Sequence, residues 1–142
     1  MDDFSLDKFI PYQLAVLAER VSREFSASYR DRYGIIRSEW RVIVHIWAAG
    51  PVSVREVHKR VDMDKSKVSR AATRLENAGL ITKTQDDTDR RLLKLEMSDE
   101  GRAMMTELLP LAAQYEAELL ERLGEEADTF RKLLNTLLSD TP

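Results

Sequence analysis

The stretch that decides the fold is Asp64-Lys65-Ser66-Lys67-Val68-Ser69-Arg70-Ala71-Ala72-Thr73-Arg74-Leu75-Glu76-Asn77-Ala78-Gly79. Its apolar residues recur at intervals of three and four, which predicts a helix whose inner face holds small side chains. Asp64 is a favourable N-cap residue, and Gly79 supplies a left-handed stop. The outer face carries serine, threonine, lysine and arginine. The stretch therefore predicts a helix that packs closely on one side and presents cations on the other.

A shorter helix is predicted directly before this one. Ser53 and Glu56 form a capping box, because the Ser53 hydroxyl can accept from the Glu56 amide while the Glu56 carboxylate reaches back. The helix then runs to about Val61, and the turn Asp62-Met63-Asp64 joins it to the charged helix. Two helices joined by so tight a turn predict a helix-turn-helix.

Behind the charged helix the pattern becomes that of strands. Residues 80–84 favour a strand, residues 93–97 alternate with period two, and the polar segment 85–91 lies between them. This pattern predicts a hairpin with a charged tip. The expected fold is therefore mainly α, a winged helix-turn-helix with a small β-hairpin wing, flanked by N-terminal and C-terminal helices.

Two helices are predicted before this motif. Pro11 suits the first turn of a long amphipathic helix that runs to Gly34. Ser38 can cap a second helix with an almost wholly apolar face, which Gly50-Pro51 ends sharply. The density of apolar side chains on this second helix predicts that it forms the core.

The last third of the chain is also predicted to be helical. Ser98 can cap a long helix that Gly124 breaks, and a last helix follows it. The apolar side chains on one face of that last helix are Phe130, Leu133, Leu134, Leu137 and Leu138. The flanking helices carry more apolar surface than one small domain can cover, which favours a second copy of the chain as their partner. The alternative is that both extensions pack on their own core.

Composition excludes several classes of protein. The length of 142 residues suits one compact domain. No segment approaches the roughly 18 to 20 apolar residues of a membrane span, and the start, Met1-Asp2-Asp3-Phe4, is unlike a secretory signal. We therefore expect a cytoplasmic protein with no membrane partner. Without cysteine there is no disulfide or thiolate metal site, and only His45 and His58 could supply histidine ligands.

The net charge of −3 conceals an uneven distribution. Residues 53–94 carry 11 basic and 7 acidic side chains, whereas residues 95–142 carry 4 and 11. A basic middle on an otherwise acidic body favours one binding face for a polyanion. The alternative is a solvated surface with unevenly placed charge.

The charged helix has the side chains that DNA reading requires. Short polar side chains are needed where backbone and base edges come close, and long cations reach guanine edges or phosphates. The amino end of a helix also presents backbone amides that suit a phosphate. The residues expected to contact DNA are Lys65, Ser66, Lys67, Ser69, Arg70, Thr73 and Arg74. The alternative is an ordinary solvated helix face.

The predicted wing carries acids beside two arginines. Asp89 could orient an arginine or cap the turn, because aspartate binds local backbone amides readily. Arg90 and Arg91 would then reach a minor groove, where negative potential is concentrated over narrow A·T-rich stretches. We therefore expect Asp89, Arg90 and Arg91 to form a second contact with DNA.

These motifs resemble the MarR (multiple antibiotic resistance regulator) family of winged-helix transcription factors, over most of the chain. The resembling segments are residues 64–70, 74–80, 86–91 and 95–101. Met97-Ser98 stands where Leu-Thr is more usual, a conservative departure. The resemblance implies a homodimer whose interlocked outer helices place two recognition helices on a pseudo-palindromic operator. It also implies transcriptional regulation, with repression as the family's commoner mode.

We therefore expect a single MarR-like domain, residues 1–142. Its winged helix-turn-helix DNA-binding part is residues 35–98, and its helical dimerisation parts are residues 7–34 and 99–142. In the resembled family, many members release DNA when a small, often aromatic and anionic, molecule binds between these parts. The candidates for binding such an effector here are Tyr12, Arg23, Trp40, Arg41 and His45.

Simpler roles compete with the effector site. Trp40 and Trp47 lie seven residues apart on an apolar face and suit the core. Arg23 and Arg41 suit surface or dimer salt bridges, and His45 suits a hydrogen-bonded histidine in the core or an interface.

The sequence argues against three other classes of function. An enzyme would need a nucleophile with a base, a paired acid and base, or a phosphate-cradling glycine loop, and the sequence offers none of them, so we expect neither an enzyme nor a cofactor. A metal-responsive regulator would need clustered ligands, which the spacing of the histidines does not provide. A winged protein-interaction module without DNA reading would favour apolar anchors over this cationic face.

Overall fold

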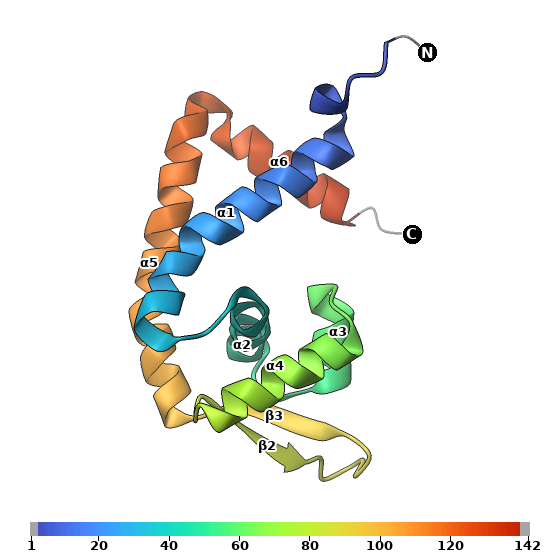
Figure 1. Ribbon diagram of the computed structural model, residues 1–142, viewed down its shortest axis with the longest axis vertical. Coiled ribbons are helices and arrows are strands. Elements are labelled where there is room, and N and C mark those ends of the chain that lie inside the picture. The colour runs from blue at the N-terminus through green and yellow to red at the C-terminus, as the bar shows by residue number, and fades with distance from the viewer. Residues whose placement is uncertain (1–2, 140–142) are drawn as a thin grey trace. The chain divides into compact units, whose positions relative to one another are not determined.

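The computed structural model describes residues 3–139, which divide after Leu108 into two compact units. Its helices are η1 (Leu6–Lys8), α1 (Ile10–Tyr33), α2 (Arg37–Ala49), α3 (Val54–Val61), α4 (Lys65–Asn77), α5 (Asp99–Leu123), η2 (Gly124–Glu126) and α6 (Ala127–Ser139). Its strands are β1 (Val52–Ser53), β2 (Ile81–Gln85) and β3 (Leu93–Met97). The mainly α fold with a small β wing is confirmed (Figure 1).

The hairpin forms part of a three-stranded antiparallel sheet with the order β1-β3-β2. Leu95 of β3 lies opposite Val52 on one side and Lys83 on the other. β1 was not predicted, because a strand of two residues has no periodicity to detect. Ser53 ends this strand and also starts α3, where its hydroxyl accepts from the Glu56 amide at 3.1 Å as the sequence predicted.

The core of the first unit lies where α2 and α4 pack together (Figure 1). The fully buried side chains of these two helices are Val42, Ile43, Ile46, Val68, Ala71, Ala72 and Leu75. Alanines at the contact let the two backbones approach closely, so that α4 can be held by dispersion contacts over its whole inner face. The inner face of small residues is thus confirmed.

The beginning of α2 corrects one prediction. The helix starts at Arg37, and its N-cap residue is Ile36 rather than Ser38. The carboxylate of Glu39 accepts from the backbone amide of Ile36 at 3.2 Å and so satisfies the amide at the helix start. Glu39 can do this although it is only 6% exposed, because the buried carboxylate has a partner.

The two tryptophans of α2 differ in their surroundings. Trp40 is half-buried and stacks on the ring of Tyr29 from α1, with 5.1 Å between ring centroids. Trp47 remains 38% exposed, so the prediction that it belongs to the core is wrong. A separation of seven residues places two side chains on one helix face, but it does not say how far along the helix the covering elements extend.

Candidate nucleic-acid interface

α4 separates its buried face cleanly from a polar outer face. The exposed residues of the outer face are Lys65, Ser66, Lys67, Arg70, Thr73 and Arg74, and Ser69 is half-buried among them. All seven residues of the charged helix that were predicted to contact DNA thus lie on its outer face, whereas the other three predicted contacts belong to the wing. Asp64 occupies the predicted N-cap position, although within residues 3–139 its side chain makes no capping hydrogen bond.

The outer face is hollowed toward its carboxyl-terminal half. Ser69, Arg70, Thr73 and Arg74 line a shallow depression of about 300 Å³. The Thr73 hydroxyl donates to the carbonyl of Ser69 at 3.0 Å and accepts from the amine of Lys83 at 2.8 Å. The depression therefore has one wall fixed by a contact between α4 and β2.

Sequence reasoning missed Lys83. Its side chain is only 17% exposed, and its amine also lies 3.8 Å from the carboxylate of Glu76. The available signal was a cation inside the strand predicted directly after α4. Lys83 joins the wing to α4 and thereby fixes the angle between the two elements expected to contact DNA.

Sequence reasoning also missed Glu39 as a neighbour of the outer face. Its second carboxylate oxygen lies 3.7 Å from the guanidinium of Arg74, whose own side chain is 56% exposed. Arg74 is therefore held partly toward α2, while Arg70 extends from the same face without such an acid beside it in the described chain. The cations of α4 thus divide into a restrained one and freely exposed ones.

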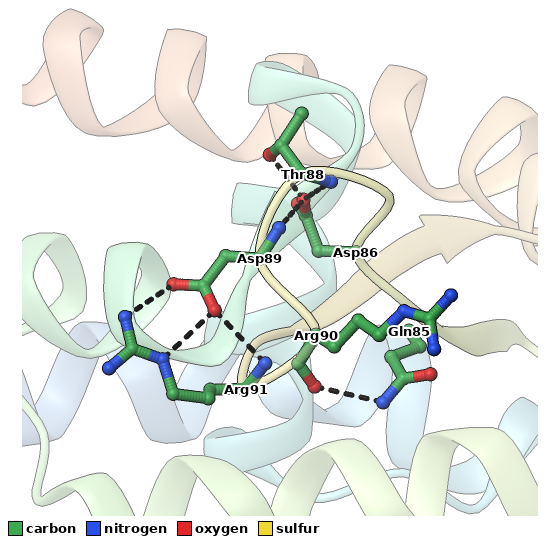
Figure 2. A network of polar contacts seen from close by, with 6 residues as sticks. All are labelled: Gln85, Asp86, Thr88, Asp89, Arg90 and Arg91. Carbon is green, nitrogen blue, oxygen red and sulfur yellow. Dashed lines mark hydrogen bonds and ion pairs between the residues drawn. The ribbon is translucent and has the colours of Figure 1, made fainter.

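The wing tip is organised by two aspartates (Figure 2). One Asp86 carboxylate oxygen accepts from the amide and hydroxyl of Thr88, at 2.8 and 2.7 Å, and from the Asp89 amide at 3.1 Å. Asp89 accepts from the Arg91 amide and from two guanidinium nitrogens at 3.0 and 3.1 Å. The prediction that Asp89 orients an arginine is confirmed, and the turn itself is capped by Asp86.

These bonds favour the ionised form of both aspartates. The hydroxyl of Thr88, and then the two backbone amides, hold the pKa of Asp86 below its ordinary value. The Arg91 guanidinium, and then the Arg91 amide, hold the pKa of Asp89 below its ordinary value. Arg91 remains 86% exposed, so its guanidinium stays accessible from solvent while Asp89 orients it through two of its nitrogens.

The five residues predicted to bind an effector are not brought together within one chain. Tyr12 lines a hollow on α1, and Arg23 lines a second hollow, of about 330 Å³, between α1 and the start of α2. Arg41 lines a third, of about 570 Å³, which also contains Glu19, Arg37 and Lys67. Trp40 stacks on an α1 tyrosine instead.

His45 differs from the simpler role that the sequence suggested. It is half-buried on α2, and within residues 3–139 its buried Nε2 atom has no hydrogen-bond partner. The expectation of a hydrogen-bonded histidine is therefore wrong for this nitrogen. Burial, and then the positive charge of Arg60, hold the pKa of His45 below its ordinary value, which favours the neutral ring.

In the part of the chain that the structure describes, histidine and acidic side chains form no group of three that could hold a metal ion. None of the described helices is both long and apolar enough to cross a membrane.

The helix-turn-helix, the cationic outer face of α4 and the adjoining wing define a winged helix-turn-helix protein. The sequence pattern of the MarR family matches residues 33–92, the segment that contains α2 to α4 and most of the wing. The chain is therefore similar to the MarR family over this segment, and the relatives described next are transcriptional regulators.

Two curated relatives are transcriptional regulators. The HTH-type transcriptional repressor MdtR of Bacillus subtilis is 29% identical over 117 residues, which cover 82% of this chain and 75% of MdtR. The HTH-type transcriptional regulator MgrA of Staphylococcus aureus is 23% identical over 107 residues, which cover 75% of this chain and 73% of MgrA.

Solved structures with the same fold cover nearly the whole chain. A MarR/EmrR family transcriptional regulator from Acinetobacter sp. ADP1 has a TM-score of 0.84 and 27% identity, covering 96% of both chains. BpsR of Bordetella bronchiseptica, whose DNA binding is regulated by 6-hydroxynicotinic acid, has a TM-score of 0.83 and 21% identity, covering 98% of this chain and 99% of BpsR.

The pairing of Asp89 with Arg91 makes a prediction about pH. Because the guanidinium favours the ionised carboxylate, the pairing is complete above the ordinary Asp pKa of 3.8 and is lost as pH falls through the lower pKa of folded Asp89. Arg91→Gln should therefore raise the pKa of Asp89 in a carboxyl carbon NMR titration. Arg90→Gln, which removes a cation from the same tip, should leave that pKa in place. Equal shifts in both variants would contradict the pairing.

Proposed function

We propose that the protein is a homodimeric regulator that binds a pseudo-palindromic site in double-stranded DNA and represses transcription there. The observation that carries this proposal is the outer face of α4, where exposed cations and short hydroxyl side chains share one accessible surface beside the wing. That mixture suits base edges and phosphates at once. The name of MdtR, a transcriptional repressor, supports repression as the mode of action.

The proposed contacts fall into two groups. Lys65, Ser66 and Lys67 lie in the first turn of α4, where backbone amides without intrahelical partners also favour an anion, and suit phosphates. Arg70, one turn further, suits a guanine edge in the major groove. Arg90 and Arg91 of the wing suit the adjacent minor groove, with Asp89 orienting the guanidinium of Arg91.

The proposed contact of Arg70 with a base edge predicts a loss of sequence reading when Arg70 is removed. We expect wild-type protein to enrich genomic fragments that share an inverted repeat, with half-sites about one helical turn apart. Arg70→Ala should weaken binding to the enriched site by about 1–3 kcal/mol and relax its sequence preference, because a bidentate base contact is lost. Binding is measured by fluorescence anisotropy at several salt concentrations.

The control for this measurement is Arg122→Ala, which removes an equal charge from an exposed position of α5. It should leave sequence preference unchanged. A uniform loss on all duplexes in Arg70→Ala, with a salt slope reduced by about 1, would assign Arg70 to a phosphate and contradict base reading. Failure of wild-type protein to enrich any fragment would contradict the proposed function itself.

Exposed apolar side chains support the homodimer. In α1, Leu14 and Leu17 are 44% and 47% exposed, and in α6, Leu133 and Leu137 are 56% and 62% exposed. Apolar residues spaced along one helix face normally lie against a partner. A second copy of the chain supplies a matching apolar surface by symmetry, which is the usual arrangement of soluble oligomers.

We therefore predict a dimer at micromolar concentration in sedimentation equilibrium. Leu137→Asp should shift the mass toward the monomer, because a charge would be buried in the interface without a partner. Asn135→Asp, which adds the same charge at an exposed polar position of the same helix, should leave the dimer intact. A wild-type monomer at this concentration would contradict the homodimer.

The 570 Å³ cavity supports a small anionic effector. Three cationic side chains line it, Arg37, Arg41 and Lys67, against one acid, Glu19, which pairs with Arg37 at 2.7 Å. Its volume lies in the range of small-molecule sites. Because Lys67 is also a proposed DNA contact, a bound anion would compete with phosphate for the same amine. Regulation of BpsR by 6-hydroxynicotinic acid supports an aromatic acid as the class of ligand.

This proposal predicts stabilisation by aromatic acids. Benzoate or 6-hydroxynicotinate at about 100 times its dissociation constant should raise the melting temperature by about 5–10 °C, since binding to the folded state alone contributes roughly 2.7 kcal/mol. Lys67→Gln, which removes a cation that lines the 570 Å³ cavity but not the 330 Å³ hollow, should remove most of this rise. Arg23→Gln, which removes a cation that lines only the 330 Å³ hollow, should retain it. If Arg23→Gln instead removes the rise and Lys67→Gln retains it, the site lies in that hollow, and no rise with either acid would contradict an aromatic acid effector.

A further inference from the structure

The turn between α3 and α4 is held from two sides. The guanidinium of Arg41, from α2, donates to the carbonyl of Val61, the last residue of α3. On the other side, Nδ1 of His58 lies 2.5 Å from the carbonyl of Met63. The chain reverses between these two carbonyls, where Asp62 adopts the left-handed conformation at φ 55°.

The Val61 carbonyl needs a donor from outside its own helix. Carbonyls in the last turn of a helix have no intrahelical partner, and the negative end of the helix dipole lies there. A cation that donates a hydrogen bond answers both requirements. Asp62 adopts the left-handed conformation without the conformational freedom of a glycine. Contacts on either side of it therefore determine where the following helix begins.

Arg41 connects this turn to the element on which α4 rests. The inner face of α4 packs against α2, and Arg41 extends from the same α2 to the residue that precedes the turn. The orientation of α4 is therefore set at its middle by buried side chains and at its beginning by one guanidinium. Arg41 also lines the 570 Å³ cavity together with Met63 and Lys67, so the cavity and the turn share this side chain.

We propose that Arg41 is a positioning residue for DNA reading, which sets the start of α4 by holding the Val61 carbonyl. The proposal rests on the function proposed for α4 and adds a residue outside the DNA-contacting face. Loss of the Arg41 bond should loosen the turn while leaving the buried packing of α4 intact. Sequence-specific binding should then weaken because the amino end of α4 no longer enters the groove in one fixed position.

The test compares Arg41→Gln and Arg41→Lys with wild type in hydrogen exchange. Arg41→Gln should raise amide exchange of residues 62–68 severalfold without changing exchange in the buried part of α4. Arg41→Lys, which can still donate one hydrogen bond to the carbonyl, should restore part of the protection. Lys59→Gln, which removes a cation from the last turn of α3, should leave the exchange of residues 62–68 unchanged.

DNA binding supplies the second readout. Arg41→Gln should weaken binding to the enriched site about five- to tenfold, as expected for a partly exposed hydrogen bond to a charged donor, with an unchanged salt slope. A salt slope reduced by about 1 would make Arg41 a phosphate contact and overturn the proposal. Unchanged exchange of residues 62–68 in a folded Arg41→Gln protein would overturn it as well.

The two readouts separate this inference from the proposed function. If wild-type protein selects no DNA, the proposed function fails, and hydrogen exchange still decides whether Arg41 holds the turn. If wild type selects DNA but Arg41→Gln binds it equally well, only the positioning role fails. Should Arg41→Gln unfold, Arg41→Lys carries the comparison, and full wild-type exchange and affinity in that variant would overturn a positioning role that needs the guanidinium of Arg41.

Discussion

The structure depends on the close packing of the small inner face of α4 against α2. Ala71 and Ala72 are fully buried and let the helices approach, while Val68 and Leu75 fill the space on either side of them. Because one face of α4 is completely buried, only the other can reach a DNA groove. The packing that stabilises the first unit is thus also what selects the residues available for recognition. Interiors accept added volume poorly, so the small size of these residues is part of the site.

The outer face of α4 is not uniform. Its amino-terminal half holds Lys65, Ser66 and Lys67 in the exposed first turn, where the helix dipole reinforces their preference for an anion. Its carboxyl-terminal half is tied to the protein, since Thr73 bonds to the wing lysine and Arg74 lies near a buried acid. Because these side chains are already restrained, they lose less conformational entropy when DNA binding orders them. The expected recognition surface therefore combines an exposed electrostatic end with a more rigid end.

Much of the fold could be predicted because several local signals agreed. The alternation of residues 93–97, the spacing on α4 and the cap at Ser53 each pointed to the same motif, and their agreement is what specifies a structure. Predictions that used a single residue were weaker. Ser38 was a plausible cap, yet the helix starts two residues earlier, where the buried carboxylate of Glu39 accepts from the amide of Ile36. Trp47 has the spacing of a core residue, but no element covers it fully in the described chain.

By itself the sequence determined which residues lie on which face of each helix, because the helical period converts spacing directly into direction. It thereby determined the cationic character of α4, and the arginine and aspartate that pair in the wing lie close enough in the chain to be read from it. Tertiary structure alone decided the contacts between distant segments. Lys83 meets Thr73, Glu39 approaches Arg74, and Arg41 holds the turn before α4 only after the chain has folded. The physical reason is that these contacts depend on the separation and angle of packed helices, which side chains along the whole interface set together and no local pattern encodes.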